Sequence, residues 1–470
     1  MKTFQDFLQI KDTDEARIDF IRQAINEHKA GDLYKIAYDA DLYFKKRNVT
    51  IRAYEKMLYT LEGQAVKDDF SPNYKMASGF FKRFVTQEKS YLLGNGVTWK
   101  NKKTADKLGT QEKPFDTQLQ DLAEMALIGA VSFGFFNRDH VDTFSVLEFV
   151  PLFDEEDGAL KAGIRFWQIA PDKPVRATLF ELDGYTEYIW DDMDKNNSKD
   201  VKGRVYVGKR TYTEIVKTSP ADGTQIYEGD NYPSFPIVPL WANKEKQSEI
   251  IGIREQIDCF DLIRSGYANN VDEGSIIYWL IQNAGGMEDF EIKRFLDRVR
   301  VNHFFSADEE GATAEPHTIS YPYEARSALL DRLEKDMYKD AMALNTEDIA
   351  SGAVTATQIE ASYEPLNEKT DGLEYRVIEF INGILALAGI KDEQPTFTRS
   401  IIVNTTETIS NVLQASALLG ETYSVKKILT LLGDGDQAQD VLNNLDIESI
   451  QRYKPMETEE QEQEPEQEVR

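Results

Sequence analysis

The sequence contains a single cysteine, Cys259, and only four histidines among its 470 residues. A lone cysteine excludes an internal disulfide, and no histidine has a second histidine or cysteine at ligand spacing, so a transition-metal site is not expected. Cys259 lies within a row of apolar residues at helical spacing, which predicts that it is buried in the core. The absence of a disulfide framework fits a reducing compartment.

Long apolar runs are also absent. The longest, such as residues 126–136 and 384–390, are far shorter than the roughly 20 residues that span a bilayer. The opening stretch MKTFQDFLQIKDTDEA introduces acidic residues too early for a secretory signal. We therefore expect a soluble, intracellular protein with no membrane partner.

Positive charge is scarce as well. The 82 acidic residues outnumber the 54 basic ones and give a net charge of −28, which argues against wrapping nucleic acid through phosphate neutralisation. Composition is otherwise that of a folded protein, with 41% hydrophobic and 11% aromatic residues. Only the acidic stretch METEEQEQEPEQEVR at the end is expected to be disordered.

No pattern of catalytic residues emerges. Residues 203–210, GRVYVGKR, have the glycine spacing and lysine of a phosphate-binding loop, but Arg210 replaces the metal-binding Ser or Thr, so a β-strand is favoured. The acid clusters 154–157 and 191–194 could hold calcium, but they lack the twelve-residue loop pattern and are expected to be solvated turns. We predict no catalytic residue, no metal site and no cofactor.

The first half of the chain predicts helices followed by strands. Residues 12–29 form a helical pattern opened by a capping box from Asp12 to Glu15. Residues 74–93 form a second, closed by Gly94 in a left-handed conformation, and residues 115–136 a third. Short β-type runs separated by turn clusters then fill residues 143–241, the pattern of an antiparallel meander. The fold class is therefore α+β.

The second half predicts two helices, 248–273 and 323–344, that bracket an insert with an apolar strand at 276–281 and a short helix at 288–299. A loop of small residues follows. An apolar heptad stripe, interrupted by the polar Thr370, then predicts a long helix over 355–387 that Pro365 should kink. A strand-like FTRSIIVN and helices at about 407–419 and 424–432 complete the pattern.

Several stretches, in their order along the chain, carry a resemblance to a known family. They are NYKMASGFFKRFVTQEKSYLLGNGVTW, FDTQLQDLAEMALIGAVSFGFF, LEFVPLFD, FPIVPLWANKEKQSEIIGIREQIDCFDLIRSGYANN, SGAVTATQIEASYEPL and FTRSIIVN followed by LLGETYSVKKILTLL. The sequence resembles the portal proteins of tailed double-stranded DNA bacteriophages, in the branch of long-tailed phages with Gram-positive hosts. Gly96 stands where that family usually has proline after its Tyr-Leu-Leu-Gly-Asn signature.

The resemblance implies the portal fold. Its parts would be a β-rich wing (1–247), a stem helix (248–273), an α/β clip (274–321), a second stem helix (322–344), a tunnel loop (345–354), a long kinked wing helix with a wing strand (355–404), a helical crown (405–453) and a disordered acidic tail (454–470).

The resemblance also implies function. The chain would form a ring, twelve-fold in the virion, at one capsid vertex, serving as the channel for DNA packaging and ejection. Implied partners are the terminase, the head–tail adaptor, the major capsid and scaffolding proteins, and translocating double-stranded DNA read without sequence specificity. The protein would occupy the virion, and the host cytoplasm during assembly. The alternatives are another phage head or tail structural protein, or a phage DNA-metabolism enzyme using acidic residues and Lys209.

Three groups of site residues follow from this mapping. The tunnel loop would present Asn345, Glu347, Asp348, Ser351, Gly352 and Ala353 to the DNA channel; the clip would bind partners through Lys293, Arg294, Arg298 and Arg300; and stem packing would involve Ile257, Phe260, Leu333 and Met337. The clip cations are equally compatible with a solvated helix face. The stem residues are compatible with a seam between subunits or with packing inside one subunit.

The loop between the predicted helices has its own physical logic. Between Lys339 and Lys369 there is no basic residue, whereas six acidic residues occur there. A ring of such segments would repel a DNA duplex instead of gripping it. The small residues from Ala350 to Thr355 keep steric bulk low, and Gly352 adds conformational freedom. The alternative is an ordinary exposed connector between helices.

Overall fold

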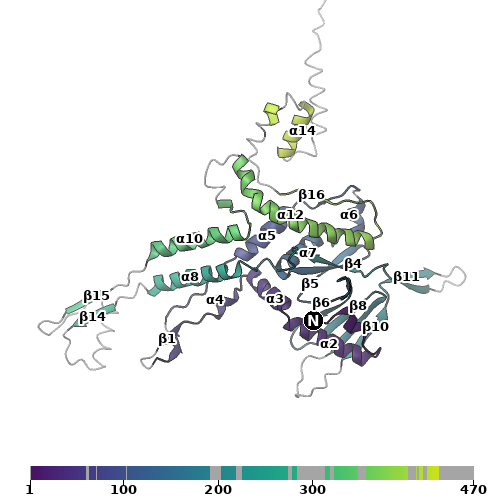
Figure 1. Cartoon of the computed structure of the whole chain (residues 1–470), viewed down its shortest axis with the longest axis horizontal. Helices are drawn as coiled ribbons and strands as arrows, with labels where there is room; N and C mark the ends of the chain where they lie inside the picture. Colours follow the sequence, from purple (N-terminus) through teal and green to yellow (C-terminus); the bar gives the residue numbers. More distant parts are fainter. Residues whose placement is uncertain are drawn as a thin grey trace, which may run out of the picture. The chain divides into compact units, whose positions relative to one another are not determined.

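The computed structural model describes residues 2–59, 63–69, 71–101, 103–190, 203–218, 225–273, 278–282, 313–317, 322–347, 356–400, 409, 412–415 and 421–432. The chain divides into two compact units. One contains residues 1–345 and 365–400, and the other contains residues 346–364 and 401–470. The architecture is mixed α+β, as the sequence predicts (Figure 1).

The chain begins with short helices and a small hairpin. These elements are α1 (Phe4–Leu8), α2 (Asp14–Ala30), α3 (Asp32–Phe44), α4 (Val49–Ala53), β1 (Met57–Tyr59) and β2 (Ala65–Lys67). The predicted capping box at α2 is wrong: Thr13 is the N-cap, and its hydroxyl accepts a hydrogen bond from the N–H of Ala16. Asp12 lies outside the cap and pairs with Arg17 at 3.0 Å.

The second predicted helix begins later than expected, because α5 spans Phe80–Leu93 and residues 74–78 are extended. Gly94 has φ −61°, so it is not the left-handed residue; Gly96, with φ +71°, takes that conformation. The short elements β3 (Val97–Thr98) and α6 (Lys103–Leu108) follow. The family's usual proline could not adopt the positive φ found at Gly96.

The third predicted helix is too long. Helix α7 spans Phe115–Gly129, and Ala130 breaks it with φ +72°. The next residues, VSFGFFN, form strand β4 (Val131–Asn137), which is buried along most of its length. A run that is apolar on every side has no periodicity to separate a helix from a buried strand.

The predicted antiparallel meander is confirmed. One five-stranded sheet has the order β10-β9-β8-β7-β6 and another has the order β13-β4-β5, with β11–β12 as a separate hairpin. The strands are β5 (His140–Ser145), β6 (Phe149–Phe153), β7 (Leu160–Trp167), β8 (Val175–Glu181), β9 (Gly184–Trp190), β10 (Arg204–Arg210), β11 (Thr213–Thr218), β12 (Gln225–Asp230) and β13 (Ile237–Trp241). Helix α2 packs on the larger sheet through a shared apolar core.

The segment that resembles a phosphate-binding loop is strand β10, which confirms the predicted β-strand. Lys209 lies on this strand and pairs with Asp183 at 2.7 Å and Glu181 at 3.3 Å. The acid cluster at 154–157 is a turn in which Asp157 pairs with Lys161 at 2.9 Å. Within the described residues, no group of three or more acidic, histidine or cysteine side chains is arranged to hold a metal ion.

Two long helices carry the insert. Helices α8 (Arg254–Glu273) and α10 (Tyr323–Asp340) run alongside each other, and between them in sequence β14 (Tyr278–Gln282) pairs antiparallel with β15 (Thr313–His317) (Figure 1). Strand β14 confirms the predicted strand at 276–281, whereas β15 was not predicted. The predicted helix 288–299 lies outside the described residues.

Cys259 contradicts its prediction. It is exposed on α8, because Ile257 and Phe260 point toward the core and Cys259, one of the two residues between them, lies on the other face.

Helix α12 (Ala356–Leu387) contains Pro365 and confirms the predicted long helix. Its apolar heptad positions are buried, and the polar member Thr370 is fully buried with its hydroxyl donating to the carbonyl of Leu366 at 2.6 Å. Strand β16 (Thr396–Phe397) pairs with β3. In the other unit, α14 spans Glu421–Leu432, residues 409 and 412–415 of the predicted helix 407–419 are helical, and the acidic tail lies outside the described residues. No described helix has both the length and the apolar character needed to cross a membrane.

Candidate functional site at the roots of α8 and α10

Aromatic side chains anchor α8 and α10 on α5. Phe260 of α8 meets Phe80 edge-on with ring centroids 5.0 Å apart, and Tyr338 of α10 meets Phe84 at 5.3 Å. Edge-to-face pairs of this kind add to the stabilisation from area burial alone. The residues that the sequence predicts for stem packing belong to this same core: Ile257, Phe260 and Met337 are buried in it and Leu333 packs against it. They thus pack inside the chain, in the core that also contains residues of α5.

A row of polar side chains on α8 holds the extended segment before α5. The N–H groups of Tyr74, Met76 and Ser78 donate to Asn269, Ser265 and Asp261 at 2.7, 3.0 and 2.8 Å, respectively. Four residues of a helix rise about 6 Å, and two residues of an extended chain span about 6.6 Å, so the two spacings stay in register over three bonds. These N–H groups are therefore unavailable for a helix, which explains why α5 begins only at Phe80.

Asp261 is the most buried member of this row. It is 0% exposed, and one of its oxygens also accepts a hydrogen bond from the amide of Asn48, itself 1% exposed. Burial raises the pKa of Asp261, while the hydrogen bonds from Asn48 and Ser78 oppose the rise. A buried carboxylate with two donors ties α8 to both the α3–α4 connection and the start of α5.

The end of α10 is a tight cap that leads into the predicted tunnel loop. The N–H of Ala343 donates to the carbonyl of Tyr338, and the N–H of Met342 donates to that of Lys339. This pair of bonds is the Schellman motif, which requires a left-handed residue. Met342 takes that position with φ +51°, where glycine is the usual residue. The direction in which the chain leaves α10 is thereby fixed.

Gln87 of α5 holds the next residue of the loop. Its side-chain N–H donates to the carbonyl of Leu344 at 2.9 Å, and its side-chain oxygen accepts from the N–H of Leu344 at 3.0 Å. Both backbone groups of a single residue are thus satisfied by one side chain. Because Leu344 is also buried, the residue that precedes the loop is held firmly against α5.

A buried charge cluster joins four segments at the same place. The ammonium of Lys369, on α12, lies 2.8 Å from Glu88 of α5 and 2.7 Å from Glu249, and it donates to the carbonyl of Ala341 at 3.2 Å. The side chain of Glu88 is only 3% exposed and those of Lys369 and Glu249 are 15% and 17% exposed. One lysine thus serves two carboxylates and the end of α10.

The two carboxylates compete for that lysine. Burial and, to a lesser extent, the nearby charge of Glu249 raise the pKa of Glu88 to about 7 against the opposing effect of Lys369. Burial opposes the charge of Lys369, but the two carboxylates nevertheless raise its pKa. The ammonium therefore stays charged, and Glu88 is the member that takes up a proton.

Sequence reasoning missed Gln87, Glu88, Lys369 and Asp261. The sequence contained only one indication: Glu88 and Asp261 are acidic residues on otherwise apolar faces of their helices. Such a position suggests that the carboxylate has a buried partner, but it does not identify that partner. Of the predicted channel residues, Asn345 and Glu347 are described, directly after the Gln87 contact. Outside the described residues lie Asp348, Ser351, Gly352, Ala353, Lys293, Arg294, Arg298 and Arg300.

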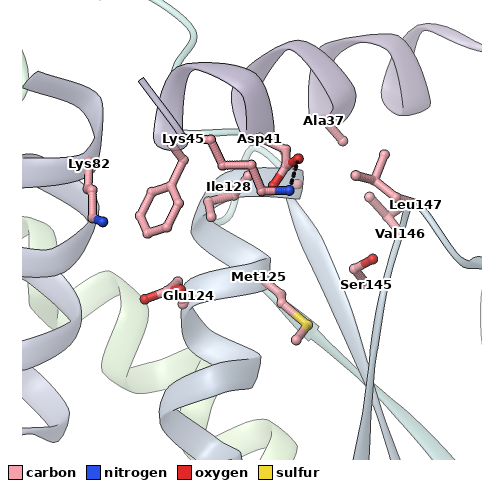
Figure 2. A pocket seen from close by; sticks show the side chains of 12 residues that line it. Ala37, Asp41, Lys45, Lys82, Glu124, Met125, Ile128, Ser145, Val146 and Leu147 are labelled. Carbon is pink, nitrogen blue, oxygen red and sulfur yellow. Dashed lines mark hydrogen bonds and ion pairs between the residues drawn. The ribbon is translucent and has the colours of Figure 1, made fainter. Parts of the chain in front are cut away.

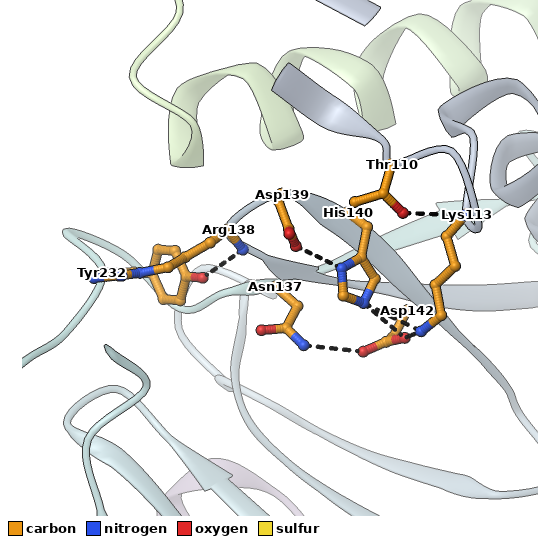
Figure 3. A network of polar contacts seen from close by, with 8 residues as sticks. All are labelled: Thr110, Lys113, Asn137, Arg138, Asp139, His140, Asp142 and Tyr232. Atoms are coloured by element: carbon orange, nitrogen blue, oxygen red, sulfur yellow. Dashed lines mark hydrogen bonds and ion pairs between the residues drawn. The ribbon is translucent and has the colours of Figure 1, made fainter. Parts of the chain in front are cut away.

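A second polar network surrounds His140, one of the four histidines (Figure 3). Lys113 lies 3.1 Å from Nε2 of His140, and Asp139 lies 2.6 Å from its Nδ1. Lys113 also donates to Asp142. Because the lysine can only donate, the imidazole proton belongs on Nδ1. The network ties the segment before α7 to the β4–β5 hairpin.

A pocket of about 390 Å³ opens between α3, α7 and residues 145–147 (Figure 2). Its floor is apolar, and its two carboxylates are already engaged: Asp41 with Lys45 at 2.6 Å, and Glu124 with Lys89. A general acid–base pair needs groups free to exchange protons with a substrate. The lining of this pocket presents no such pair.

Comparisons with known proteins identify the family of this sequence. A family described as "Phage portal protein, SPP1 Gp6-like" matches residues 22–463. The portal protein of Clostridium phage phiCD119 is 27% identical over 231 residues, which are 44% of this chain and 51% of that protein. The portal protein of Bacillus phage SPP1 is 22% identical over 440 residues, 86% of this chain and 81% of that protein.

The match to the clostridial protein therefore spans about half of that protein's length. Among solved structures, the neck of a native GTA particle computed with C12 symmetry is similar over 75% of this chain and 90% of that chain, with 10% identity and a TM-score of 0.41. The family match alone covers all of the elements from α2 to α14 except the first residues of α2. The chain belongs to the SPP1 Gp6-like family of phage portal proteins.

Proposed function

We propose that this portal protein forms a ring, of twelve copies in the virion, at one vertex of the capsid. The ring is the channel through which double-stranded DNA is packaged and ejected. It is also the platform on which the terminase docks during packaging and the head–tail adaptor docks afterwards. Within the assembling particle it contacts the major capsid and scaffolding proteins.

The order of elements is the observation that carries this proposal. Among the described residues, helix α8, the β14–β15 pair, helix α10 and the long helix α12 follow one another in this order, and the sequence between α10 and α12 is rich in small and acidic residues. In this reading α8 and α10 are the stem, the insert is the clip, residues 345–354 are the tunnel loop, and α12 belongs to the wing. The residues from 405 to 453 form the crown.

The clip cations Lys293, Arg294, Arg298 and Arg300 are assigned to partner binding. Their chain is strongly acidic, so a local basic cluster is a surface that an acidic partner can recognise.

Ring formation is the first test. Purified protein imaged by negative-stain electron microscopy should show rings with a central hole, since a head-to-tail contact that closes on itself produces a cyclic assembly. A preparation that contains only compact monomers over a wide range of protein concentrations would contradict the proposal.

The tunnel loop provides a second prediction. Replacing Ser351 and Ala353 by arginine adds two cations per subunit where the sequence has none between Lys339 and Lys369. Each new phosphate contact adds affinity for DNA, so a ring of them should slow translocation and reduce packaged, nuclease-protected DNA by roughly tenfold at low salt. Ring assembly should be unchanged.

A double replacement of the same two residues by glutamine is the matched control, because it adds bulk without charge. If the loop faces the channel, the arginine defect should weaken as salt increases and the glutamine variant should package nearly normally. Normal packaging by the arginine variant would show that this segment does not face DNA.

A further inference from the structure

A groove beside the start of α5 gathers positive charge. Among the described residues it is lined by four cationic side chains, those of Lys46, Lys82, Arg83 and Arg264, and by hydroxyl and amide groups of α5. No described carboxylate lines it, although the chain carries 82 acidic residues and 54 basic ones. The groove is therefore a concentrated positive site on a negatively charged protein.

These cations lie where the helix itself disfavours them. The first turn of α5 contains Lys82 and Arg83 and no acidic residue, and its N-cap, Gly79, has no side-chain cap. The side chain of Lys46 also crosses this end: a Cβ built on Gly79 would lie 3.2 Å from its ammonium. The N-terminus of a helix carries positive partial charge, so cations there repel it.

The described part of the chain compensates this arrangement only in part. Arg83 lies 3.8 Å from Glu334 and donates to the hydroxyl of Tyr338, and the ammonium of Lys82 lies over the ring of Phe44. Lys46, Lys82 and Arg264 form no ion pair with a described carboxylate. A local arrangement that costs energy in the isolated chain is a sign that a partner supplies what is missing. The partner must be anionic.

The same chain also presents a surface of unpaired negative charge. On α12, Glu360, Glu364 and Glu368 are exposed at four-residue spacing and form no ion pair among the described residues. Side chains four residues apart on a helix are neighbours, and like charges at this spacing repel one another. We call these three residues the acidic ridge.

We propose that the acidic ridge of one copy docks into the basic groove of the neighbouring copy. The contact is head to tail, because two different surfaces of the same chain meet, and such contacts close into rings. Each surface relieves the repulsion of the other, and complementary charge also fixes which faces meet. The proposal rests on the ring proposed above and names the residues that close it.

One consequence concerns the channel. Glu360, Glu364 and Glu368 then belong to the contact between subunits, and the acidic residues of the tunnel loop itself, Glu347 and Asp348, remain to face the DNA.

Charge reversal tests the contact. A groove variant carries Lys82→Glu and Arg264→Glu, and a ridge variant carries Glu364→Lys and Glu368→Lys. Each variant alone would bring like charges together at every contact, so we expect at least about a tenfold loss of rings in each, measured by native mass spectrometry and negative-stain imaging.

Mixing the two variants is the decisive step. In an alternating ring, the acidic groove of one variant meets the basic ridge of the other, and the basic groove meets the acidic ridge. Equimolar mixing should therefore restore rings that contain both variants in equal number, which different affinity tags would identify.

Matched controls change the same number of charges elsewhere. Lys107→Glu with Lys244→Glu, and Asp106→Lys with Glu245→Lys, alter exposed side chains outside both surfaces and should leave ring formation intact. Circular dichroism of all variants checks that each is folded.

The outcomes separate this proposal from the ring itself. Rings from wild type and from both reversed variants alone would overturn the contact and leave the ring standing. Folded variants that fail to form rings even when mixed would also overturn it. If mixing fails but a single chain carrying all four changes forms rings, the ridge and groove meet within one chain. Absence of rings from wild type would remove both proposals.

Discussion

Replacing Lys369 by methionine is expected to lower the free energy of unfolding by about 3 kcal/mol at pH 8, since removing one partner of a buried ion pair leaves uncompensated charge in the interior. The change leaves Glu88 and Glu249 facing each other without a cation and removes a donor from the carbonyl of Ala341. Urea unfolding followed by circular dichroism, at one protein concentration for all variants, measures the loss.

The pH dependence distinguishes lost charge from lost packing. The pKa of Glu88 rises from an ordinary 4.5 to about 7 on folding. Between these pH values the folded state binds more protons than the unfolded state, so wild-type stability should fall as pH rises from about 4.5 to 7 and then level off. At pH 5 Glu88 of the methionine variant can take up a proton at little cost, and we expect the deficit of this variant to shrink to about 1 kcal/mol.

A double variant provides the matched control. Lys369→Met combined with Glu88→Gln removes the lysine together with one of its carboxylates, and should recover more than half of the loss at pH 8. A pH-independent deficit, with no recovery in the double variant, would mean that Lys369 acts only through its aliphatic stem.

The sequence predicted the elements whose side chains repeat with a clear period. Helices α8, α10 and α12 have apolar residues at three- and four-residue spacing, and the strands of the meander are short β-type runs separated by turn clusters. The type of each element therefore followed from the local sequence pattern. The prediction of β4 as part of a helix is wrong because residues 131–136 are mostly apolar and show neither a helical nor a strand periodicity. Met342 in a left-handed conformation also left no signal, because the motif usually shows glycine at that position.

The polar contacts at the helix roots could not be predicted, because each joins residues far apart in sequence. Asp261 and the N–H of Ser78 are separated by 183 positions, and Gln87 and Leu344 by 257. A single sequence shows that an acidic residue lies on an apolar helix face, but it does not show which hydrogen-bond donor contacts that residue. These hydrogen bonds also explain why the prediction of a helix over residues 74–78 is wrong: the backbone N–H groups of this segment bond to side chains of α8 instead of forming a helix.

These contacts place the predicted channel loop in a rigid frame. The Schellman cap, Gln87 and Lys369 all act within four residues of one another, at Ala341, Met342 and Leu344, immediately before the loop begins. The proposed tunnel loop would therefore begin at a fixed point, and any movement of the loop would not be passed on to α10.

The second large effect is expected for Asp261→Ala, which should lower the free energy of unfolding by about 3 kcal/mol. It leaves the N–H of Ser78 and one bond of the Asn48 amide without an acceptor, and each buried donor that loses its partner costs about 1–3 kcal/mol. Ser265→Ala removes a single acceptor from a less critical point of the same row and should cost about 1 kcal/mol.

The position of the damage is as informative as its size. Because Asp261 holds the end of the extended segment nearest α5, its loss should raise hydrogen exchange at the amides of residues 74–78 while the β-sheets stay protected. Asp261→Asn supplies the control: its side-chain oxygen still accepts from Ser78, but its amide faces the amide of Asn48, so we expect an intermediate loss. If the alanine variant unfolds within about 0.5 kcal/mol of wild type and residues 74–78 keep their protection, the row on α8 does not hold this segment, and the late start of α5 needs another cause.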